Sequence, residues 1–281
     1  MAVKLVALDI DGTIVPGRGE SAELPSDRMT GAIRGLVEVG IVVILASGRM
    51  FPGSASIARH LGLETPLICQ QGCSIHNPDG STLHEFAIKP RLAVEIVTHA
   101  RAIGHDYEWF NSVRYIASRE SPETRNYGIV SGVTPEYRPD PERSGVTPTG
   151  VGVISSQADA PHIHRDLASR YADQLHLLDF PTVTVAVAPE ANKGHALSLL
   201  CKALGIGRHE TVAVGDSVND APMLAWAGRG IALGHSDRYA LDAADEVLPD
   251  DGAEPVAGLL EGLARSYWTA ARTPARSPAS S

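Results

Sequence analysis

The sequence predicts an α/β fold built on a parallel sheet, with a smaller α+β module inserted into it. Three observations lead to this fold class. Short apolar runs alternate with helical patterns over the first third of the chain. The alternation stops in the middle of the chain, where paired strand patterns and long loops replace it. It resumes at Lys193, which indicates that the middle module is inserted rather than appended.

The first third of the chain supplies the opening strands and helices of the parallel sheet. Residues 3–8 are an apolar run that predicts a buried strand, and 41–46 and 66–69 predict the second and third strands. A helix is expected to begin near Ser26 and to end at Gly40, and a shorter one is expected at about 54–61. The helical stripe of the first helix consists of Met29, Ala32, Ile33, Leu36 and Val37.

The middle of the chain has a different pattern. Residues 74–86 surround an Asn-Pro-Asp-Gly turn and predict a hairpin. Paired strands are expected within 106–118, and the stretch 119–149, which is rich in proline and glycine, predicts long loops. The remaining elements expected here are helices at about 91–103 and 159–173 and strands at 151–155 and within 176–188.

The last third returns to strand–helix alternation and ends in a long helix followed by a polar tail. We therefore expect a discontinuous core domain made of residues 1–84 and 189–270, with 85–188 inserted as a second domain. The tail, residues 271–281, is low in apolar side chains and is expected to lack stable structure.

Composition narrows the class of protein. The formal net charge of −9 argues against nucleic acid as an obligate partner. The three cysteines, Cys69, Cys73 and Cys201, are too few for a disulfide framework and are expected to be buried thiols. No apolar run approaches the length of a membrane span, and the N-terminus lacks a signal-peptide pattern. These features predict a soluble, cytoplasmic protein; the oligomeric state stays open.

Polar side chains follow the strands of the predicted parallel sheet, at the points where the strands end. Asp9 follows the first strand, Ser47 the second, and Asp216 the strand at 211–215. In an open α/β sheet this carboxyl edge is where ligands bind. Lys193 begins the helix before the last of these strands, so it is expected at the same edge.

Acidic residues dominate that edge. Asp216, Asn219 and Asp220 lie within the segment GDSVND, and Asp9 and Asp11 lie in DIDGT. Unit charges about 4 Å apart repel by about 4 kcal/mol at an effective dielectric constant near 20, so such a cluster is costly without a cation or a bound proton. Carboxylates are hard oxygen ligands, which favours Mg²⁺.

A metal-neutralised carboxylate beside Lys193 and Ser47 is typical of a phosphoryl-transfer site, in which the cations and the hydroxyl bind the phosphoryl oxygens. Asp is a known nucleophile toward phosphorus. Residues 9 and 11 of an extended segment project to the same side. One carboxyl is therefore expected to attack phosphorus, while the other acts as acid toward the leaving oxygen and then as base toward water.

At these residues the sequence resembles the haloacid dehalogenase superfamily. The four motifs of the family match Asp9-Ile10-Asp11-Gly12-Thr13, Ser47 in ASGR, Lys193 in NKG, and GDSVND. The long insert between the second and third motifs resembles a C2-type cap, and NKGHAL, GDSVNDAPML and GIALG resemble the Cof-type branch of subfamily IIB. The resemblance implies a Rossmann-like core with a C2B-type cap. The chain departs from the family at Gln71-Gly72-Cys73, where many relatives have Asn-Gly-Ala.

The resemblance also implies roles for individual residues. Asp9 matches the nucleophile and a Mg²⁺ ligand, and Asp11 matches the general acid and base, with its backbone carbonyl on the metal. Asp216 matches the remaining protein ligand, and Asp220 supports the metal site. The residues that match phosphate or substrate contacts are Ser47, Lys193 and Asn219.

The function expected from the sequence is Mg²⁺-dependent hydrolysis of a small phosphomonoester, such as a sugar phosphate, through an aspartyl-phosphate. Two alternatives stay open: a phosphomutase of the phosphomannomutase type, and a non-catalytic sensor that binds a phosphate ligand in the same pocket. Asn111 and Arg114, in the expected inserted domain, are weaker candidates for contacts with the substrate.

Overall fold

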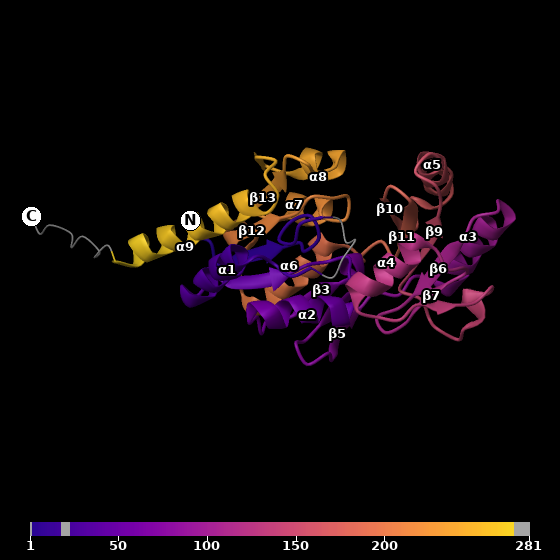
Figure 1. Ribbon diagram of the computed structural model, residues 1–281, viewed down its shortest axis with the longest axis horizontal. Helices are drawn as coiled ribbons and strands as arrows, with labels where there is room; N and C mark the ends of the chain where they lie inside the picture. Colours follow the sequence, from indigo (N-terminus) through magenta and orange to yellow (C-terminus); the bar gives the residue numbers. More distant parts are fainter. Residues whose placement is uncertain (1, 18–22, 273–281) are drawn as a thin grey trace, which may run out of the picture.

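The computed structural model describes residues 2–17 and 23–272. Two bodies lie side by side along the long axis of the molecule (Figure 1). One body contains the first and the last described residues and a parallel sheet, and the other contains a mixed sheet formed by the middle of the chain. The expected fold class, an α/β core with a parallel sheet and an inserted α+β domain, is confirmed.

The sheet of the first body has five parallel strands in the order β14-β13-β12-β1-β2. The strands are β1 (Leu5–Leu8), β2 (Val42–Leu45), β12 (Thr211–Val214), β13 (Arg229–Leu233) and β14 (Glu246–Leu248). The helices around it are α1 (Asp27–Glu38), α2 (Phe51–Leu61), α6 (Lys193–Leu204), α7 (Ala221–Trp226), α8 (Arg238–Ala243) and α9 (Glu254–Arg272).

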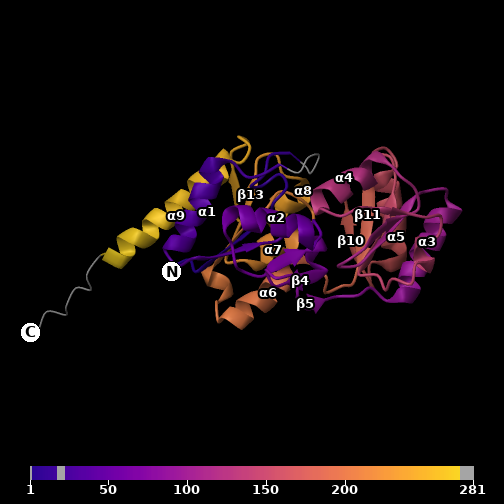
Figure 2. The same ribbon diagram turned by 60° about the horizontal axis from the view of Figure 1, so that its bottom comes forward.

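Both faces of this sheet are covered, which explains why its strands are apolar throughout. Val6 and Leu8 of β1 pack into a core with α1, α2 and α9, while Leu5 and Ala7 pack into a second core with α6 and α7. Helix α9 lies alongside α1 in both views (Figures 1 and 2). The layers thus form a doubly covered sheet whose strand ends are held at a common edge.

Helix α1 follows its expected pattern with one exception. The Ser26 side chain caps its N-terminus by accepting from the Met29 N–H, and four of the five predicted stripe residues are buried. Val37, the fifth, is 47% exposed, although its neighbour Leu36 in the same last turn is fully buried. Gly40, at a φ of +85°, allows the turn into β2.

A small antiparallel sheet lies next to β2. It consists of β3 (Leu67–Cys69), β4 (Ser74–His76) and β5 (Thr82–Glu85), with a 3-10 turn η1 (Gln70–Gly72) between the first two. The predicted hairpin is confirmed by the pairing of β4 with β5. The third strand, β3, was expected in the parallel sheet, but it meets β2 only through one isolated parallel bridge, Ala46 to Ile68.

The second body is a six-stranded sheet in the order β10-β11-β9-β6-β7-β8. Its strands are β6 (Tyr107–Phe110), β7 (Tyr115–Ala117), β8 (Glu136–Tyr137), β9 (Gly150–Ile154), β10 (His176–Asp179) and β11 (Val183–Val187). Helices α3 (Pro90–Ala102) and α5 (Ala160–Tyr171) pack on one face of it through a common apolar core. The opposite face turns toward the first body, where Phe110 and Val185 share a core with Met50 and Val218.

Helix α4 (Pro122–Ser131) lies in the stretch that was expected to form only loops, so that expectation was wrong. Its N-terminus has a capping box between Ser121 and Thr124, and Gly132 ends it in the left-handed region. Its buried residues are small or polar, which hides the apolar periodicity of a helix. Helix α4 packs on α2 at Gly53, where a Cβ atom would lie 2.1 Å from the Val130 carbonyl oxygen.

The chain passes between the two bodies twice, between β5 and α3 and between β11 and α6. The two crossings lie close together, because the rings of Phe86, after β5, and His195, at the start of α6, are in contact with their centroids 5.5 Å apart. Helix α9 continues to Arg272, so the first two residues of the expected tail are helical, and residues 273–281 lie outside the described residues. Across the described ranges, 2–17 and 23–272, no helix is both long and apolar enough to cross a membrane.

Candidate active site

The carboxyl edge of the parallel sheet gathers the predicted polar residues. Asp9 follows β1 directly, and Ser47 and Asp216 each lie two residues beyond their strands, β2 and β12. Because β12, β1 and β2 are neighbours in the sheet, their ends bring these three residues to one place. Asp9 and Asp216 are buried, at 4% and 2% exposure, and Ser47 is fully buried.

Lys193 links two of the acids. It is the first residue of α6 and is fully buried, and its Nζ donates to Asp9 Oδ1 and to Asp220 Oδ1, each at 2.6 Å. Close packing of α6 on α7 makes this possible, since a Cβ atom on Gly194 would lie 2.3 Å from the Pro222 carbonyl oxygen. A larger residue at Gly194 would therefore push the lysine away from Asp220.

Asp220 also organises the loop that carries Asp216. Its Oδ2 accepts hydrogen bonds from the backbone N–H groups of Asp216 and Ser217, both at 3.0 Å. Gly12, at a φ of +83°, lies against Asp216, where a Cβ atom would come within 2.5 Å of Oδ2. The first and fourth motifs are thus in direct contact through a glycine that has no side chain to separate them.

The carboxylates of Asp9, Asp216 and Asp220 have oxygen atoms that all lie within 4.8 Å of one another. Burial and the nearby charges of Asp220, Asp216 and Asp11 raise the pKa of Asp9 well above its ordinary value, and the charge of Lys193 only partly offsets this. Burial lowers the pKa of Lys193, but the two acids that it binds outweigh burial and raise it. Three buried acids and one lysine leave excess negative charge, and the oxygen donors suit Mg²⁺.

Asp11 is held by an arginine that the sequence analysis missed. Arg49 Nε donates to Asp11 Oδ2 at 2.9 Å, and its Nη2 donates to Oδ1 at 2.6 Å. The arginine side chain is only 3% exposed, and that of Asp11 is 22% exposed. Asp11 is not in the group formed by the other three acids. Arg49 lies two residues after Ser47 in the motif ASGR, so its place at the same edge was readable from the sequence.

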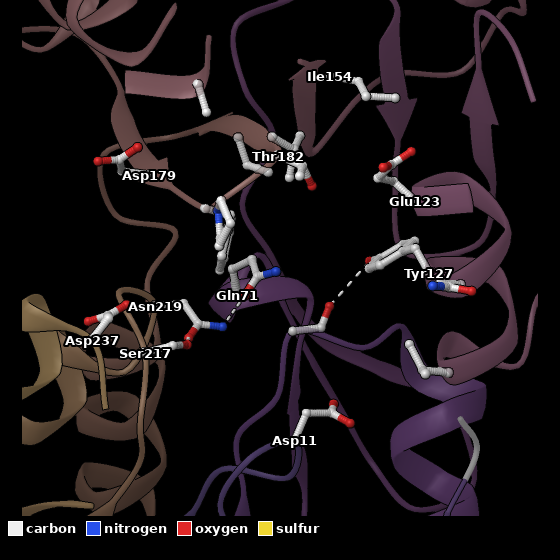
Figure 3. A pocket seen from close by; sticks show the side chains of 18 of the residues that line it. Asp11, Gln71, Glu123, Tyr127, Ile154, Asp179, Thr182, Ser217, Asn219 and Asp237 are labelled. Carbon is white, nitrogen blue, oxygen red and sulfur yellow. Dashed lines mark hydrogen bonds between the residues drawn. The ribbon is translucent and has the colours of Figure 1, made fainter. Parts of the chain in front are cut away.

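Ser47 and Asn219 lie at the same edge. Ser47 Oγ accepts from the Arg49 N–H at 3.1 Å, and within the described part of the chain its hydroxyl proton has no acceptor. Asn219 Nδ2 donates to Gln71 Oε1, and Asn219 Oδ1 accepts from Ser217 Oγ at 2.7 Å (Figure 3). Gln71, the residue that departs from the family pattern, therefore contacts a predicted site residue. It has a φ of +64°, a strained backbone for a residue with a side chain.

A cavity of about 790 Å³ lies between the two bodies. Asp9, Asp11, Asp216 and Asn219 line its base, whereas Ser47, Lys193 and Asp220 lie behind this surface. Figure 3 shows Asp11 and Asn219 facing this space, with Glu123 and Asp179 on either side of it. The second body supplies Phe110, Phe180, Val183 and Val185 among other residues.

Hydrogen bonds between the described residues join the two bodies around this cavity. The Tyr127 hydroxyl donates to the Gly48 carbonyl at 3.2 Å, and the Met50 N–H donates to Ser131 Oγ at 3.1 Å. The Tyr239 hydroxyl donates to Asp179 Oδ2 at 2.9 Å, and Gln70 Nε2 donates to the Asn111 carbonyl at 2.7 Å. These contacts hold the six-stranded sheet of the second body over the carboxyl edge of the parallel sheet, where the acidic residues lie.

The side chains suggested for the inserted domain do not line this cavity. Arg114 pairs with Glu136, with both nitrogen–oxygen contacts at 2.6 Å, and Asn111 Oδ1 accepts from the backbone of its own turn. Glu108 and Phe110 on β6 line it instead. In the sequence, these two residues could have been recognised in the segment YEWF. An acidic residue stands there among aromatic ones, and alternate side chains of a strand face opposite sides of the sheet.

Glu108 gives a testable pH dependence. It is buried, and burial raises its pKa from 4.5 to about 7, although a hydrogen bond from Tyr115 acts in the opposite direction. The unfolded chain ionises Glu108 from about pH 4.5 upward, while the folded chain stays protonated until about pH 7. The native state therefore loses stability as pH rises through this interval, by roughly 3 kcal/mol at most.

The Glu108→Gln variant lacks this titration. We expect its free energy of unfolding, measured with urea at a series of pH values, to rise relative to wild type between pH 4.5 and pH 8 by roughly 2–3 kcal/mol. A difference between the two proteins that stays constant over this range would contradict the assignment.

Comparison with known proteins adds the family context. The model of the haloacid dehalogenase-like hydrolase family matches residues 6–260. The chain is 27% identical to the phosphatase YwpJ of Bacillus subtilis (strain 168), over 93% of this chain and 100% of that protein. It is 24% identical to the HMP-PP phosphatase of Enterobacter sp. (strain 638), over 83% of this chain and 85% of that protein.

The solved structures include one that shares both bodies of the fold. The subclass IIB sugar phosphatase BT4131 superposes with a TM-score of 0.78 at 17% identity, over 93% of this chain and all of that chain. At this identity the likeness concerns the fold alone. It supports the sequence-based expectation of a core with an inserted cap.

Proposed function

Because the chain belongs to the haloacid dehalogenase-like hydrolase family and is a phosphatase, we propose that it hydrolyses a small phosphomonoester through a phosphorylated Asp9. One observation carries this proposal: the buried contact of Asp9 with Lys193 and Asp220, beside Asp216. It places a carboxylate, a cation and a group of oxygen ligands around one point at the base of a closed cavity.

Asp9 is the nucleophile in this proposal. Its carboxylate oxygen attacks phosphorus, the bond from phosphorus to the leaving oxygen breaks, and an aspartyl-phosphate forms. Asp9 lines the cavity, so an ester held there can reach it, whereas Asp220 is fully buried and has hydrogen-bond partners on both oxygens. That difference supports the choice of Asp9 over Asp220.

Asp11 is the general acid and base. It protonates the leaving oxygen in the first step, and in the second it takes a proton from the water that attacks the phosphorylated Asp9 and releases phosphate. In the described conformation both of its oxygens accept from Arg49. Asp11 must therefore give up one of these hydrogen bonds to carry the proton, and Arg49 acts as its positioning residue.

Ser47, Lys193 and Asn219 are proposed as the groups that bind the phosphoryl oxygens. The Ser47 hydroxyl already accepts a backbone hydrogen bond, which orients it and leaves its own proton for a phosphoryl oxygen. Lys193 supplies positive charge beside Asp9. Asn219 is oriented by Ser217 and Gln71, so Gln71 supports the position of this amide.

Mg²⁺ fits the acidic group as its cofactor. We propose Asp9 and Asp216 as side-chain ligands, with the Asp11 backbone carbonyl beside them and Asp220 as the support that fixes the Asp216 loop. When bound, the ion offsets the negative charge of the acids and of the phosphoryl group. The three carboxylates, within 4.8 Å of one another, support this assignment.

The inserted segment, which we place at residues 85–188 between core segments 1–84 and 189–270, is proposed as the cap. It closes the cavity against bulk water and contacts the leaving group. A cavity of about 790 Å³ accommodates an ester the size of a sugar phosphate. A cytoplasmic location, with small metabolites as substrates, remains part of this proposal.

Removal of the metal tests the proposal. With EDTA, we expect release of inorganic phosphate from a panel of phosphomonoesters to fall to the uncatalysed level, and excess Mg²⁺ to restore it. The panel also separates phosphatase from mutase, because a mutase returns the phosphoryl group to a sugar and does not release phosphate at each turnover. A sensor would bind phosphate and release none.

A second measurement makes the metal test independent of activity. Mg²⁺ is expected to raise the melting temperature of the wild-type protein, because it binds the native acidic group and not the unfolded chain. Asp216→Asn should lose most of this shift, whereas the exposed Asp173→Asn, which lies on the second body, should keep it. Equal shifts in both variants would contradict the metal assignment.

A further inference from the structure

One face of the cap sheet forms the wall of the cavity opposite the catalytic acids. Glu108 and Phe110 alternate along β6 with Tyr107 and Trp109, which pack into the core against α3 and α5. Glu108 and Phe110 line the cavity, as do residues of β11 and β9. Glu108 is therefore an acid in the middle of the face that meets the leaving group.

Two glycines of β9 make room for these side chains. Gly152 pairs with Glu108 and Gly150 pairs with Phe110 across the sheet. A Cβ atom on Gly152 would lie 2.3 Å from Glu108 Oε1, and one on Gly150 would lie 2.6 Å from the Phe110 ring. Any residue other than glycine at position 152 would therefore clash with the side chain of Glu108.

The carboxyl of Glu108 is buried but only half satisfied. The residue is 9% exposed, and the Tyr115 hydroxyl donates to Oε2 at 2.5 Å. In the part of the chain that the structure describes, no group donates to Oε1 and no cation pairs with the carboxyl. Because Glu108 lines the cavity and Oε1 is not fully enclosed, a donor from a bound ligand can reach this oxygen and add a hydrogen bond.

The charges around the cavity favour a cationic donor. Glu123 and Asp179 add two further acids to its walls (Figure 3). Of the two arginines that line it, Arg49 is paired with Asp11, and Arg238, which donates to the Tyr239 hydroxyl, keeps its charge but is outnumbered by Glu108, Glu123, Asp179 and Asp237. The leaving-group side of the cavity is therefore negative, in contrast to a site that would accept a second phosphate or carboxylate.

Resting on the proposed function, we infer that Glu108 selects phosphomonoesters whose leaving group carries a protonated amino group. Such a group donates to Glu108 Oε1 while the phosphoryl group lies at Asp9. The pKa of Glu108, raised to about 7 by burial, leaves the ionised form accessible to a cation at neutral pH. Phe110, Val183 and Val185 cover the apolar part of the same leaving group.

Matched substrate pairs test this inference with the wild-type protein alone. Glucosamine 6-phosphate is compared with glucose 6-phosphate, and phosphoethanolamine with 2-hydroxyethyl phosphate, which separates amino sugars from acyclic amino alcohols. We expect kcat/KM to be about tenfold or more higher for the aminated member of at least one pair. 6-Phosphogluconate, which adds a carboxylate to the sugar, should be poorer than glucose 6-phosphate.

Two variants assign the preference to one carboxyl. Glu108→Gln keeps the size of the side chain and an acceptor for Tyr115, and it should reduce the ratio of kcat/KM within the preferred pair to near one. The matched control is Glu123→Gln, which removes an acid from the same cavity at the first turn of α4. It should keep most of the ratio.

The outcomes separate this inference from the proposed function. Preference for the hydroxylated members in both pairs, a ratio that Glu108→Gln leaves intact, or an equal loss in both variants would overturn the role of Glu108. Rapid Mg²⁺-dependent hydrolysis of p-nitrophenyl phosphate alongside those results would leave the phosphatase assignment standing. If no phosphomonoester is hydrolysed, the proposed function and this inference both fail.

Discussion

Replacement of Asp9 by asparagine is expected to reduce phosphate release by on the order of 10⁴-fold or more. An amide nitrogen and oxygen fill the space of the carboxylate, but they do not form the bond to phosphorus on which the proposed pathway depends. The loss should appear in kcat for every ester in a panel, because in the proposed mechanism Asp9 bonds to the phosphoryl group that all of them share.

The fold of this variant should remain intact. Asp9 lies in a group of buried acids that repel one another, and Lys193 keeps its contact with Asp220 when the charge at Asp9 is removed. Circular dichroism and a urea titration check this point, and Asp173→Asn, an exposed change far along the chain, is the matched control. Phosphate release within tenfold of wild type would remove Asp9 from the role of nucleophile.

Replacement of Lys193 by methionine is expected to be the most destabilising of these changes. The lysine is the only cation that contacts Asp9 and Asp220 among the described residues, and all three side chains are buried. Removal of one partner from a buried ion pair leaves a charge without compensation, which costs about 3–5 kcal/mol. We expect a loss of that size in the free energy of unfolding, measured with urea in EDTA.

The loss of stability in the Lys193→Met protein should depend on Mg²⁺. Mg²⁺ should restore part of the stability, because a cation at the acidic group replaces some of the missing positive charge. The matched control is Lys202→Met, an exposed lysine on the same helix, which should change stability by less than about 0.5 kcal/mol. A Lys193→Met protein as stable as this control would show that the buried network is not held by its charge.

The positions of the residues at the carboxyl edge of the parallel sheet could be predicted from the sequence, because the order of strands and helices determines them. Asp9, Ser47 and Asp216 each follow a strand of one parallel sheet, and parallel strands end at one edge. The place of Lys193 at this edge follows from the start of α6, which Asn192 caps. These residues needed only strand order and helix boundaries.

Other features depend on packing that a single sequence does not display. The interaction of Arg49 with Asp11 requires the path of the chain after β2, and α4 is hidden because its buried side chains are small or polar. Glu108 was overlooked for a related reason. Its strand was predicted as one of two paired strands, but which of its alternating side chains face the cavity depends on where α3 and α5 lie.

The two crossings between the bodies lie together at Phe86 and His195. An insertion whose ends are adjacent can be lengthened, reshaped or exchanged as a unit without a change in the path of the remaining chain. If the proposed mechanism holds, evolution can alter which molecules this enzyme accepts by changing the inserted segment alone, while the reaction at Asp9 is inherited unchanged.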